Sequence, residues 1–138
     1  MSRAVALITG ASSGIGRATP LHLAGQGYAL LINHRDSREA AEAVAQEVFM
    51  RGGEALVAAG DVACDEVARR LVHLAVERWG RLDALVNNAA TNPLHGSVLD
   101  AEPAAFQKTS DVNFRGYWFM TQRAAQRMRT RRPPDRVE

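Results

Sequence analysis

Short apolar segments alternate with longer amphipathic segments along this chain. Residues 4–9, 28–33, 54–59 and 83–87 are short and apolar, and glycine or polar turn residues bound them, which predicts four buried strands. Between the strands, residues 15–26, 37–51 and 65–79 carry apolar side chains at helical spacing, and a last helix is predicted over 103–128 from a proline start. This alternation predicts an α/β fold, a three-layer, doubly wound parallel sheet with strand order 3-2-1-4, which ends after about four strands and the following helix.

Pro20 disagrees with the pattern of the first predicted helix. In a helix interior, proline removes an amide donor and clashes with the preceding turn, at a cost of about 3 kcal/mol. We therefore expect a kink or a shortened first turn.

Charge is unevenly distributed, although the net charge is only +2. Residues 1–114 hold 10 basic and 13 acidic side chains, and residues 115–138 hold 7 and 2. Clustered arginines attract nucleic acid, but no aromatic residue that could stack on bases follows Phe119. We expect a cationic helix end and a basic, proline-containing tail over 129–138, with no nucleic-acid partner.

The apolar runs and the cysteine content point to a cytoplasmic protein. The longest unbroken apolar runs have five residues, against about 18 needed to span a bilayer, so we expect no membrane partner. The first apolar segment continues directly into Thr9 and Gly10, unlike a secretory signal. Cys64 is the only cysteine, which excludes an internal disulfide and a cysteine metal cage; a small buried side chain is expected there, and no metal site.

A glycine-rich turn follows the first predicted strand, with the sequence Thr9-Gly10-Ala11-Ser12-Ser13-Gly14-Ile15-Gly16. Gly10 permits a tight turn, Gly14 lets the backbone approach a diphosphate, and Gly16 lets the helix pack on the strand. Amides at the helix N-terminus and the two serine hydroxyls would donate to the anion. A strand before and a helix after the glycines predict a dinucleotide site.

Arg35 lies 19 residues beyond Gly16, where an acidic residue would bind the ribose hydroxyl of NAD. A cation at this place favours the 2′-phosphate of NADP. We expect NADP(H) to be preferred over NAD(H), with Arg35 as the main discriminator and His34 as a helper. The alternative is a solvated Arg35, with Asp36 on the ribose.

Together these residues resemble the short-chain dehydrogenase/reductase family over nearly the whole chain. Residues 9–16 are similar to its TGxxxGxG cofactor loop, Asp61-Val62 to its adenine-contacting pair, and Asn87-Asn88-Ala89-Ala90 to its NNAG motif with Ala90 in the glycine place. The resemblance implies a Rossmann-type fold and hydride transfer between a nicotinamide cofactor and a carbonyl or alcohol substrate. It also implies that Asn113 supports a water-mediated proton relay.

The positions of these motif residues suggest roles for them apart from the family resemblance. Asp61 follows a strand and can accept from an adenine amino group or cap the next helix. Asn87 and Asn88 end the fourth strand beside the predicted crevice, or form a local turn. The expected cofactor-binding residues are Thr9, Gly10, Ser12, Ser13, Gly14, Ile15, Gly16, His34, Arg35, Asp61, Val62, Asn87, Asn88, Ala89 and Ala90.

The acid/base apparatus of the family is missing from these 138 residues. Neither tyrosine is followed by lysine at the fourth position, the only lysine is Lys108, and the position of the upstream serine is lost. We expect an incomplete dinucleotide-binding domain over 1–128: a fragment, a frameshifted or truncated product, or a chain completed by a partner. In this reading the chain is the cofactor-binding portion of an oxidoreductase; the alternative is a non-catalytic NADP(H)-binding or interaction module, either as a homo-oligomer or with a complementing chain.

Overall fold

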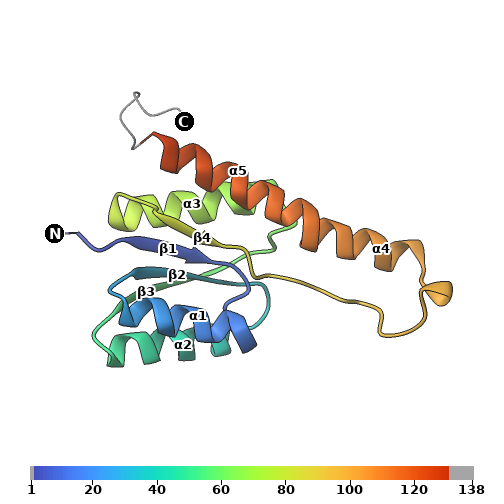
Figure 1. The fold of residues 1–138 in the computed structure, drawn as a ribbon, viewed down its shortest axis with the longest axis horizontal. Helices are drawn as coiled ribbons and strands as arrows, with labels where there is room; N and C mark the ends of the chain where they lie inside the picture. The colour runs from blue at the N-terminus through green and yellow to red at the C-terminus, as the bar shows by residue number, and fades with distance from the viewer. Residues whose placement is uncertain (1, 131–138) are drawn as a thin grey trace.

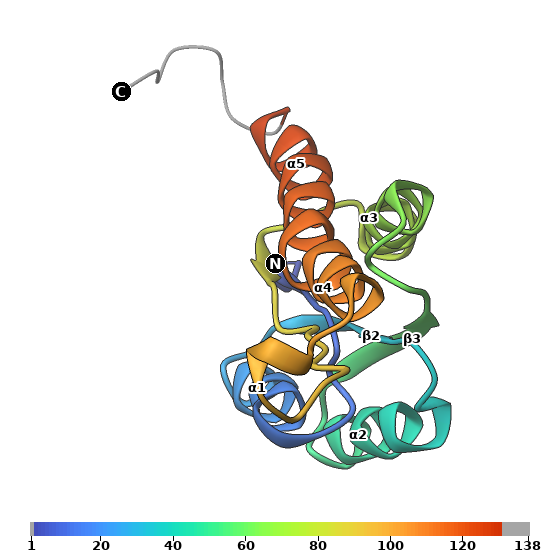
Figure 2. The ribbon, with the colours of Figure 1, turned by 90° about the vertical axis from the view of Figure 1, so that its right-hand side faces the viewer.

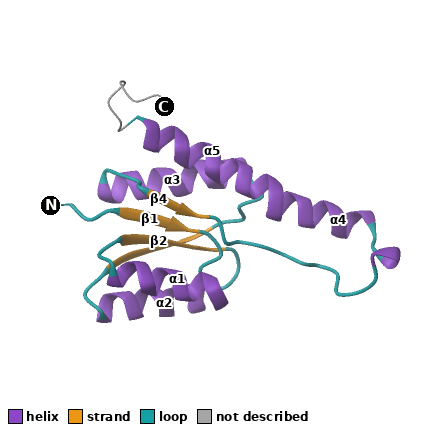
Figure 3. Cartoon of the chain, viewed as in Figure 1, coloured by secondary structure: helices purple, strands orange, loops and turns teal. Residues whose placement is uncertain are grey.

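Four parallel strands form the centre of the fold in a computed structural model, which describes residues 2–130 (Figures 1 and 3). The strands are β1 (Val5–Ile8), β2 (Ala29–His34), β3 (Glu54–Ala59) and β4 (Ala84–Val86). Their order in the sheet is β3-β2-β1-β4, with all three pairings parallel. The predicted α/β fold and strand order are confirmed. β1 and β2 are buried between neighbouring strands, whereas β3 and β4 form the edges of the described sheet and are only partly buried.

Helices cover both faces of the sheet (Figure 3). They are α1 (Gly14–Gly25), α2 (Arg38–Met50), α3 (Asp65–Trp79), α4 (Pro103–Ser110) and α5 (Gly116–Arg129). Alternate side chains of each strand point to opposite faces, so Ile8 and Ile32 pack toward α1 and α2, and Leu7 and Leu31 pack toward α3 and α5. The helices of both layers do not cover the carboxyl ends of the strands, where the connecting loops lie (Figure 2).

Pro20 does not shorten the first helix. Helix α1 starts at Gly14 and continues through Pro20 to Gly25. Of the two expected outcomes, a kink or a shortened first turn, the shortened turn is therefore wrong, and the kink stays a prediction. The proline ring is buried, and we attribute the tolerance to this burial, which offsets the lost hydrogen bond to the preceding turn.

The last helix has an irregular turn that the sequence pattern does not predict. A π-helical turn, Asp111–Arg115, lies between α4 and α5, and the Gly116 N–H donates to the Asp111 carbonyl five residues back. Figure 1 shows α4 and α5 as one continuous rod that projects past the sheet. A side chain at Gly116 would place Cβ 2.9 Å from Cγ2 of Val62, so glycine allows the rod to lie against the exit of β3.

Apolar side chains remain exposed along the last helices, and one edge of the described sheet has no partner strand. Within residues 2–130, β4 pairs with β1 alone, and Phe106, Phe114 and Trp118 are at least 63% exposed along the last helices. Cys64 is also exposed, which corrects the expectation of a buried cysteine. No helix within the described range is long and apolar enough to cross a membrane. Most of the predicted basic tail, residues 131–138, lies outside the described residues.

Candidate functional site

A cleft of about 430 Å³ opens at the carboxyl ends of the four strands. Figure 2 views the molecule from this side, with α1 and α2 on one side of the strand ends and the last helices on the other. Open parallel sheets bind ligands at this edge, where connections leave neighbouring strands in opposite directions. The lining residues are Gly10, Ser12, Ser13, Ile15, Gly16, Asn33, His34, Arg35, Asp36, Ser37, Gly60, Asp61, Val62, Asn88, Ala89, Ala90, Thr91 and Val112.

Most of the residues that the sequence singled out therefore meet in one cleft. Thr9, Gly14 and Asn87 are the expected binding residues that do not line it. The lining adds Asn33, Gly60 and other neighbours that the motifs did not indicate.

Two glycines of the turn after β1 are enforced by close packing. Gly10 has a φ of +60°, and a Cβ there would lie 2.7 Å from the Cα of Ala89. At Gly16 a Cβ would collide with the Gly10 carbonyl oxygen and the side-chain amide of Asn88. Gly14 differs, since it has a φ of +54° and open space where its side chain would be. The turn is packed against β4 on one side and open at Gly14 on the other.

The first turn of α1 has neither a capping side chain nor an acidic side chain near its free backbone amides. Ser13 occupies the N-cap position without a side-chain capping hydrogen bond, and the first turn carries no acidic residue. Helix N-termini leave four amides without helical acceptors and carry a partial positive charge. Beside the cleft, this end of α1 can donate hydrogen bonds to an anion.

The side chains of Thr9 and Asn88 join the turn after β1 to the segment after β4. The Thr9 hydroxyl oxygen accepts from the amides of Asn88 at 3.0 Å and Ala89 at 3.1 Å, and Thr9 is only 1% exposed. The Asn88 Nδ2 donates to the Gly10 carbonyl at 2.8 Å. These contacts hold the ends of β1 and β4 together and replace the local turn considered for Asn88.

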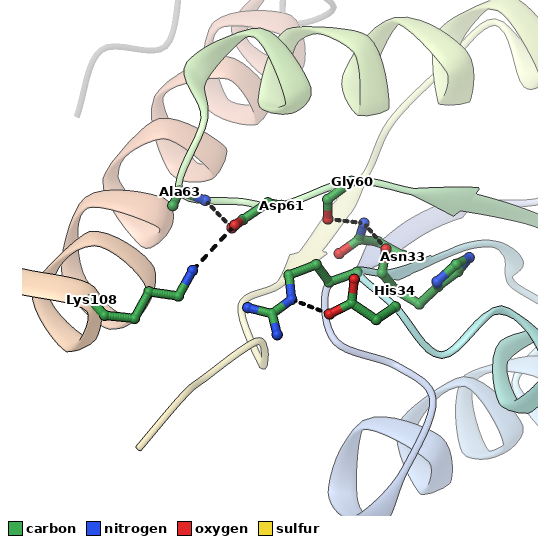
Figure 4. Close-up of polar contacts among 8 residues, drawn as sticks. Asn33, His34, Gly60, Asp61, Ala63 and Lys108 are labelled. Carbon is green, nitrogen blue, oxygen red and sulfur yellow. Dashed lines mark hydrogen bonds and ion pairs between the residues drawn. The ribbon is translucent and has the colours of Figure 1, made fainter. Parts of the chain in front are cut away.

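Asn33 is a lining residue that the motifs did not identify. Asn33 is 1% exposed, and its Nδ2 donates to the Gly60 carbonyl at 3.1 Å (Figure 4). Nδ2 also lies 3.2 Å from the Ala58 carbonyl. Its Oδ1 accepts from the Gly10 amide at 3.4 Å. A buried polar side chain requires such partners, so an asparagine at the end of an apolar strand was the available signal.

Arg35 and Asp36 follow β2 as an ion pair at the cleft. Arg35 Nε lies 2.6 Å from Asp36 Oδ2, and the Arg35 side chain is half exposed. His34 is 4% exposed, and its Nδ1 is buried without a hydrogen-bond partner within the described structure. The Arg35 guanidinium is therefore accessible, and the carboxylate that it pairs with, Asp36, is itself exposed.

Asp61 lies at the exit of β3 and has partners on both oxygens. Oδ1 accepts from the Ala63 amide at 3.0 Å, and Oδ2 lies 3.5 Å from Lys108 Nζ (Figure 4). Helix α3 has Cys64 as its N-cap residue, so the alternative that Asp61 caps this helix is wrong. Val62 is 4% exposed and lines the cleft beside Asp61.

Asn87 and Asn113, the other two asparagines predicted as site residues, join the last helices to the end of β4 and the loop after it. Asn87 Nδ2 donates to Thr121 Oγ1 at 3.0 Å, which directs this side chain to α5. Asn113 Oδ1 accepts from the Thr91 amide at 2.8 Å and its Nδ2 donates to the Thr91 carbonyl at 2.9 Å. Thr91 lines the cleft, so Asn113 acts on the site through that loop.

Comparisons with known proteins agree with this geometry. The profile of the short chain dehydrogenase family matches residues 4–134. The chain is 39% identical over 122 residues, or 88% of its length, to an L-rhamnose 1-dehydrogenase (NAD(P)(+)) of Sphingomonas sp. (strain SKA58), and covers 48% of that protein. It is 36% identical over 90% of its length to a 3-oxoacyl-[acyl-carrier-protein] reductase of Synechocystis sp. (strain ATCC 27184 / PCC 6803 / Kazusa), and covers 50% of it.

Solved structures show the same likeness. A short chain dehydrogenase from Mycobacterium avium superposes with a TM-score of 0.87 at 30% identity, over 94% of this chain and 47% of the other. A double mutant of a Serratia marcescens short-chain dehydrogenase/reductase gives 0.87 at 34% identity, over 92% and 51%. The chain thus spans about half the length of the curated relatives it matches.

Proposed function

Because this chain belongs to the short-chain dehydrogenase family, we propose that its cleft binds a nicotinamide dinucleotide and that these 138 residues do not turn over a substrate by themselves. The observation that carries the proposal is the cleft of about 430 Å³, in which the glycine turn, Arg35 and Asp61 lie together at the carboxyl edge of the sheet. When bound, the cofactor supplies or accepts the hydride. The substrate class of the complete enzyme is a carbonyl or an alcohol.

The glycine turn is the proposed seat of the diphosphate. The uncapped N-terminus of α1 offers amide donors and a favourable dipole. The open space at Gly14 leaves room for an anion to reach the backbone, and Ser12 and Ser13, which line the cleft, carry hydroxyls that can donate to it. Ile15, with 80% exposure, offers an apolar surface beside them.

Arg35 is the proposed determinant of cofactor choice. Its accessible guanidinium pairs with Asp36, and a 2′-phosphate, which carries more charge than one carboxylate, would compete for it with bidentate hydrogen bonds. His34 is proposed as a helper, because its buried Nδ1 lacks a partner. We therefore propose NADP(H) over NAD(H), whereas the family as a whole uses NAD(P) cofactors.

The β4 side of the cleft is the proposed place of the nicotinamide end. Ala89 and Ala90 offer small side chains there, and Asn113 fixes the loop at Thr91. Tyr28 and Tyr117 do not line the cleft, and neither precedes a lysine by four residues. These 138 residues therefore offer no tyrosine–lysine pair at helical spacing for protonating a carbonyl oxygen.

A second candidate function, a cofactor-binding module completed by another chain, is favoured by the exposed Phe114 and Trp118. Their exposed apolar area suits a protein contact, and so does the edge of β4 that has no partner strand within residues 2–130. A second copy of the chain or a complementing chain would bury it. Light scattering at increasing protein concentration tests self-association.

Titration calorimetry of the purified chain with NADPH and NADH, followed by a carbonyl-reduction assay, tests the main proposal. We expect binding of both cofactors, tighter binding of NADPH, and no turnover. Absence of binding at millimolar NADPH would contradict the proposed cofactor site, and turnover would contradict the proposed incompleteness.

A further inference from the structure

A groove between α3 and α5 lies apart from the cleft at the strand ends. The two helices pack side by side over one face of the sheet (Figures 1 and 2), and the groove between them has a volume of about 350 Å³. Sites for small ligands typically have about 300–1,000 Å³, so the groove has room for a small molecule. The residues that line it, none of which lines the cleft, are Arg69, Val72, His73, Val76, Arg123, Gln126 and Arg127.

The ionisable side chains in this lining are three arginines and a histidine, with no carboxylate among the described residues. Asp65 accepts from Arg123 Nε at 2.9 Å and from Arg69 Nε at 3.1 Å, and Glu66 also attracts Arg123. Both acidic residues lie in the first turn of α3. They therefore offset the positive charge at one end of the groove.

Arg127 differs from the other two arginines of the groove. It lies one helical turn beyond Arg123 on α5. Its Nε is buried and has no hydrogen-bond partner within residues 2–130, whereas Arg69 and Arg123 both reach Asp65. A shielded donor without an acceptor is unfavourable, and more so on a charged group. An anion in the groove would supply the acceptor that the described residues do not.

The remaining lining favours a phosphate group that is attached to a small organic body. A guanidinium binds phosphate with two parallel hydrogen bonds, and a phosphate monoester carries nearly two negative charges and three acceptor oxygens at neutral pH. Val72 is 8% exposed and Val76 is half-buried. These two valines offer an apolar surface between the helices for the organic part.

We propose that the groove between α3 and α5 binds a small phosphate monoester, with Arg127 as the main contact of the phosphate and with Val72 and Val76 against the organic part. None of these residues lines the cleft, so the proposal does not depend on the proposed function. Phosphate monoesters occur in soluble metabolites and in the lipid phosphatidic acid, and both present the same group to Arg127.

Titration of the backbone amide spectrum with phenyl phosphate tests this proposal in the wild type, Arg127→Met, Arg127→Lys and the control Arg129→Met. Arg129 is an exposed arginine of the same helix that does not line the groove, so its replacement removes the same charge. In the wild type we expect saturable shifts at residues 69–76 and 123–127 with millimolar probe.

The variants separate a built contact from general attraction. Arg127→Met is expected to weaken binding by about tenfold or more, because it removes the bidentate donor, and Arg129→Met by less than about twofold. Arg127→Lys is expected to lie between these values, since lysine keeps the charge and loses the fork. All variants should bind NADPH as the wild type does.

Flotation with phosphatidylcholine vesicles that contain phosphatidic acid separates the two sources of the ligand. Capture of the wild type and Arg129→Met but not of Arg127→Met would support the proposal with a lipid headgroup as the ligand. Binding of phenyl phosphate without capture that depends on Arg127 would support it with a soluble ester.

Three results would overturn the proposal. One is the absence of shifts at the groove residues of the wild type with millimolar phenyl phosphate. Another is equal weakening by Arg127→Met and Arg129→Met, which would indicate general attraction to a basic helix. The third is tighter binding of hexaglutamate than of phenyl phosphate, which would assign the groove to an acidic peptide. If the amide spectrum shows that Arg127→Met is unfolded, Arg127→Lys decides, and wild-type affinity in that variant would contradict the proposed guanidinium contact.

Discussion

Asn113 pairs with the backbone of Thr91 through both polar groups of its side chain. Oδ1 accepts from the Thr91 amide at 2.8 Å, and Nδ2 donates to the Thr91 carbonyl at 2.9 Å. The asparagine lies in the π-helical turn, and Thr91 lies in the loop that lines the cleft after β4. The irregular turn of the last helix is thereby attached to the rim of the candidate site.

Asn113→Ala tests the strength of this attachment. The substitution leaves the amide and carbonyl of Thr91 without their partners, so we expect the free energy of unfolding to fall by about 1–3 kcal/mol in urea denaturation. The control is Gln126→Ala on the exposed side of the same rod, where a change within about 0.5 kcal/mol is expected. Equal effects of the two substitutions would contradict the role given to Asn113.

Gly16→Ala tests the packing of the glycine turn. A Cβ at this position would collide with the Gly10 carbonyl oxygen and the Asn88 amide, so we expect a loss of about 1–3 kcal/mol in stability. At Gly25, near the end of the same helix, nothing lies within 4 Å of a Cβ. Gly25→Ala should therefore leave stability unchanged or raise it by up to about 1 kcal/mol. A tolerated Gly16→Ala would argue against close contact of α1 with β1 and β4.

The strands and the glycine turn could be predicted because their signals are local. An apolar run that stops at Gly10 reports a buried strand and a tight turn within a few residues, and β3 was predicted with the observed bounds, Glu54–Ala59. The π turn could not be predicted, because one extra residue between Asp111 and Arg115 hardly changes the helical spacing of the apolar side chains.

Contacts between distant segments could not be predicted from the sequence. The assignment of Thr9 and Asn87 to the cofactor stays a prediction; in the structure the Thr9 hydroxyl also accepts from two amides after β4, and the Asn87 amide donates to Thr121. The Lys108–Asp61 pair joins residues 47 positions apart. No local pattern reports such contacts, whereas the positions of the motifs at strand ends did indicate where the cleft would form.

Arg35→Gln tests the proposed preference for NADP(H). Removal of the guanidinium should weaken NADPH binding by about tenfold or more and change NADH binding by less than about threefold, because only NADPH carries the 2′-phosphate. Titration calorimetry at low and high salt would check both values, with Arg78→Gln, an exposed arginine over Trp79, as the control. A similar loss for both cofactors would contradict the assignment.

Acid should weaken the contact between α3 and α5. Asp65 accepts from Arg123 Nε at 2.9 Å, and hydrogen bonds first from Arg123 and then from Arg69, acting against desolvation, lower its pKa to about 2. A carboxyl whose pKa is lower in the folded state stabilises the fold above its unfolded pKa, and that contribution is lost between about pH 4 and about pH 2.

A comparison of Asp65→Asn with wild type checks that the stabilisation by Asp65 is lost as the pH falls. The variant should be less stable at pH 6, and the difference should shrink as the pH falls toward 2, as measured by urea denaturation at each pH. Glu77→Gln, an exposed change on the same helix, should show no such convergence. A difference that stays constant with pH would show that the charge of Asp65 is not the cause.

The backbone amide spectrum during titration with NADPH tests the central claim most directly, because it reports which amides meet the diphosphate. We predict the largest chemical-shift changes at the amides of residues 12–16. Little change is expected around Gly52 and Gly80, which lie near the amino ends of β3 and β4 and outside the cleft. Saturation that leaves residues 12–16 unperturbed, or that shifts only residues outside the cleft, would contradict the account.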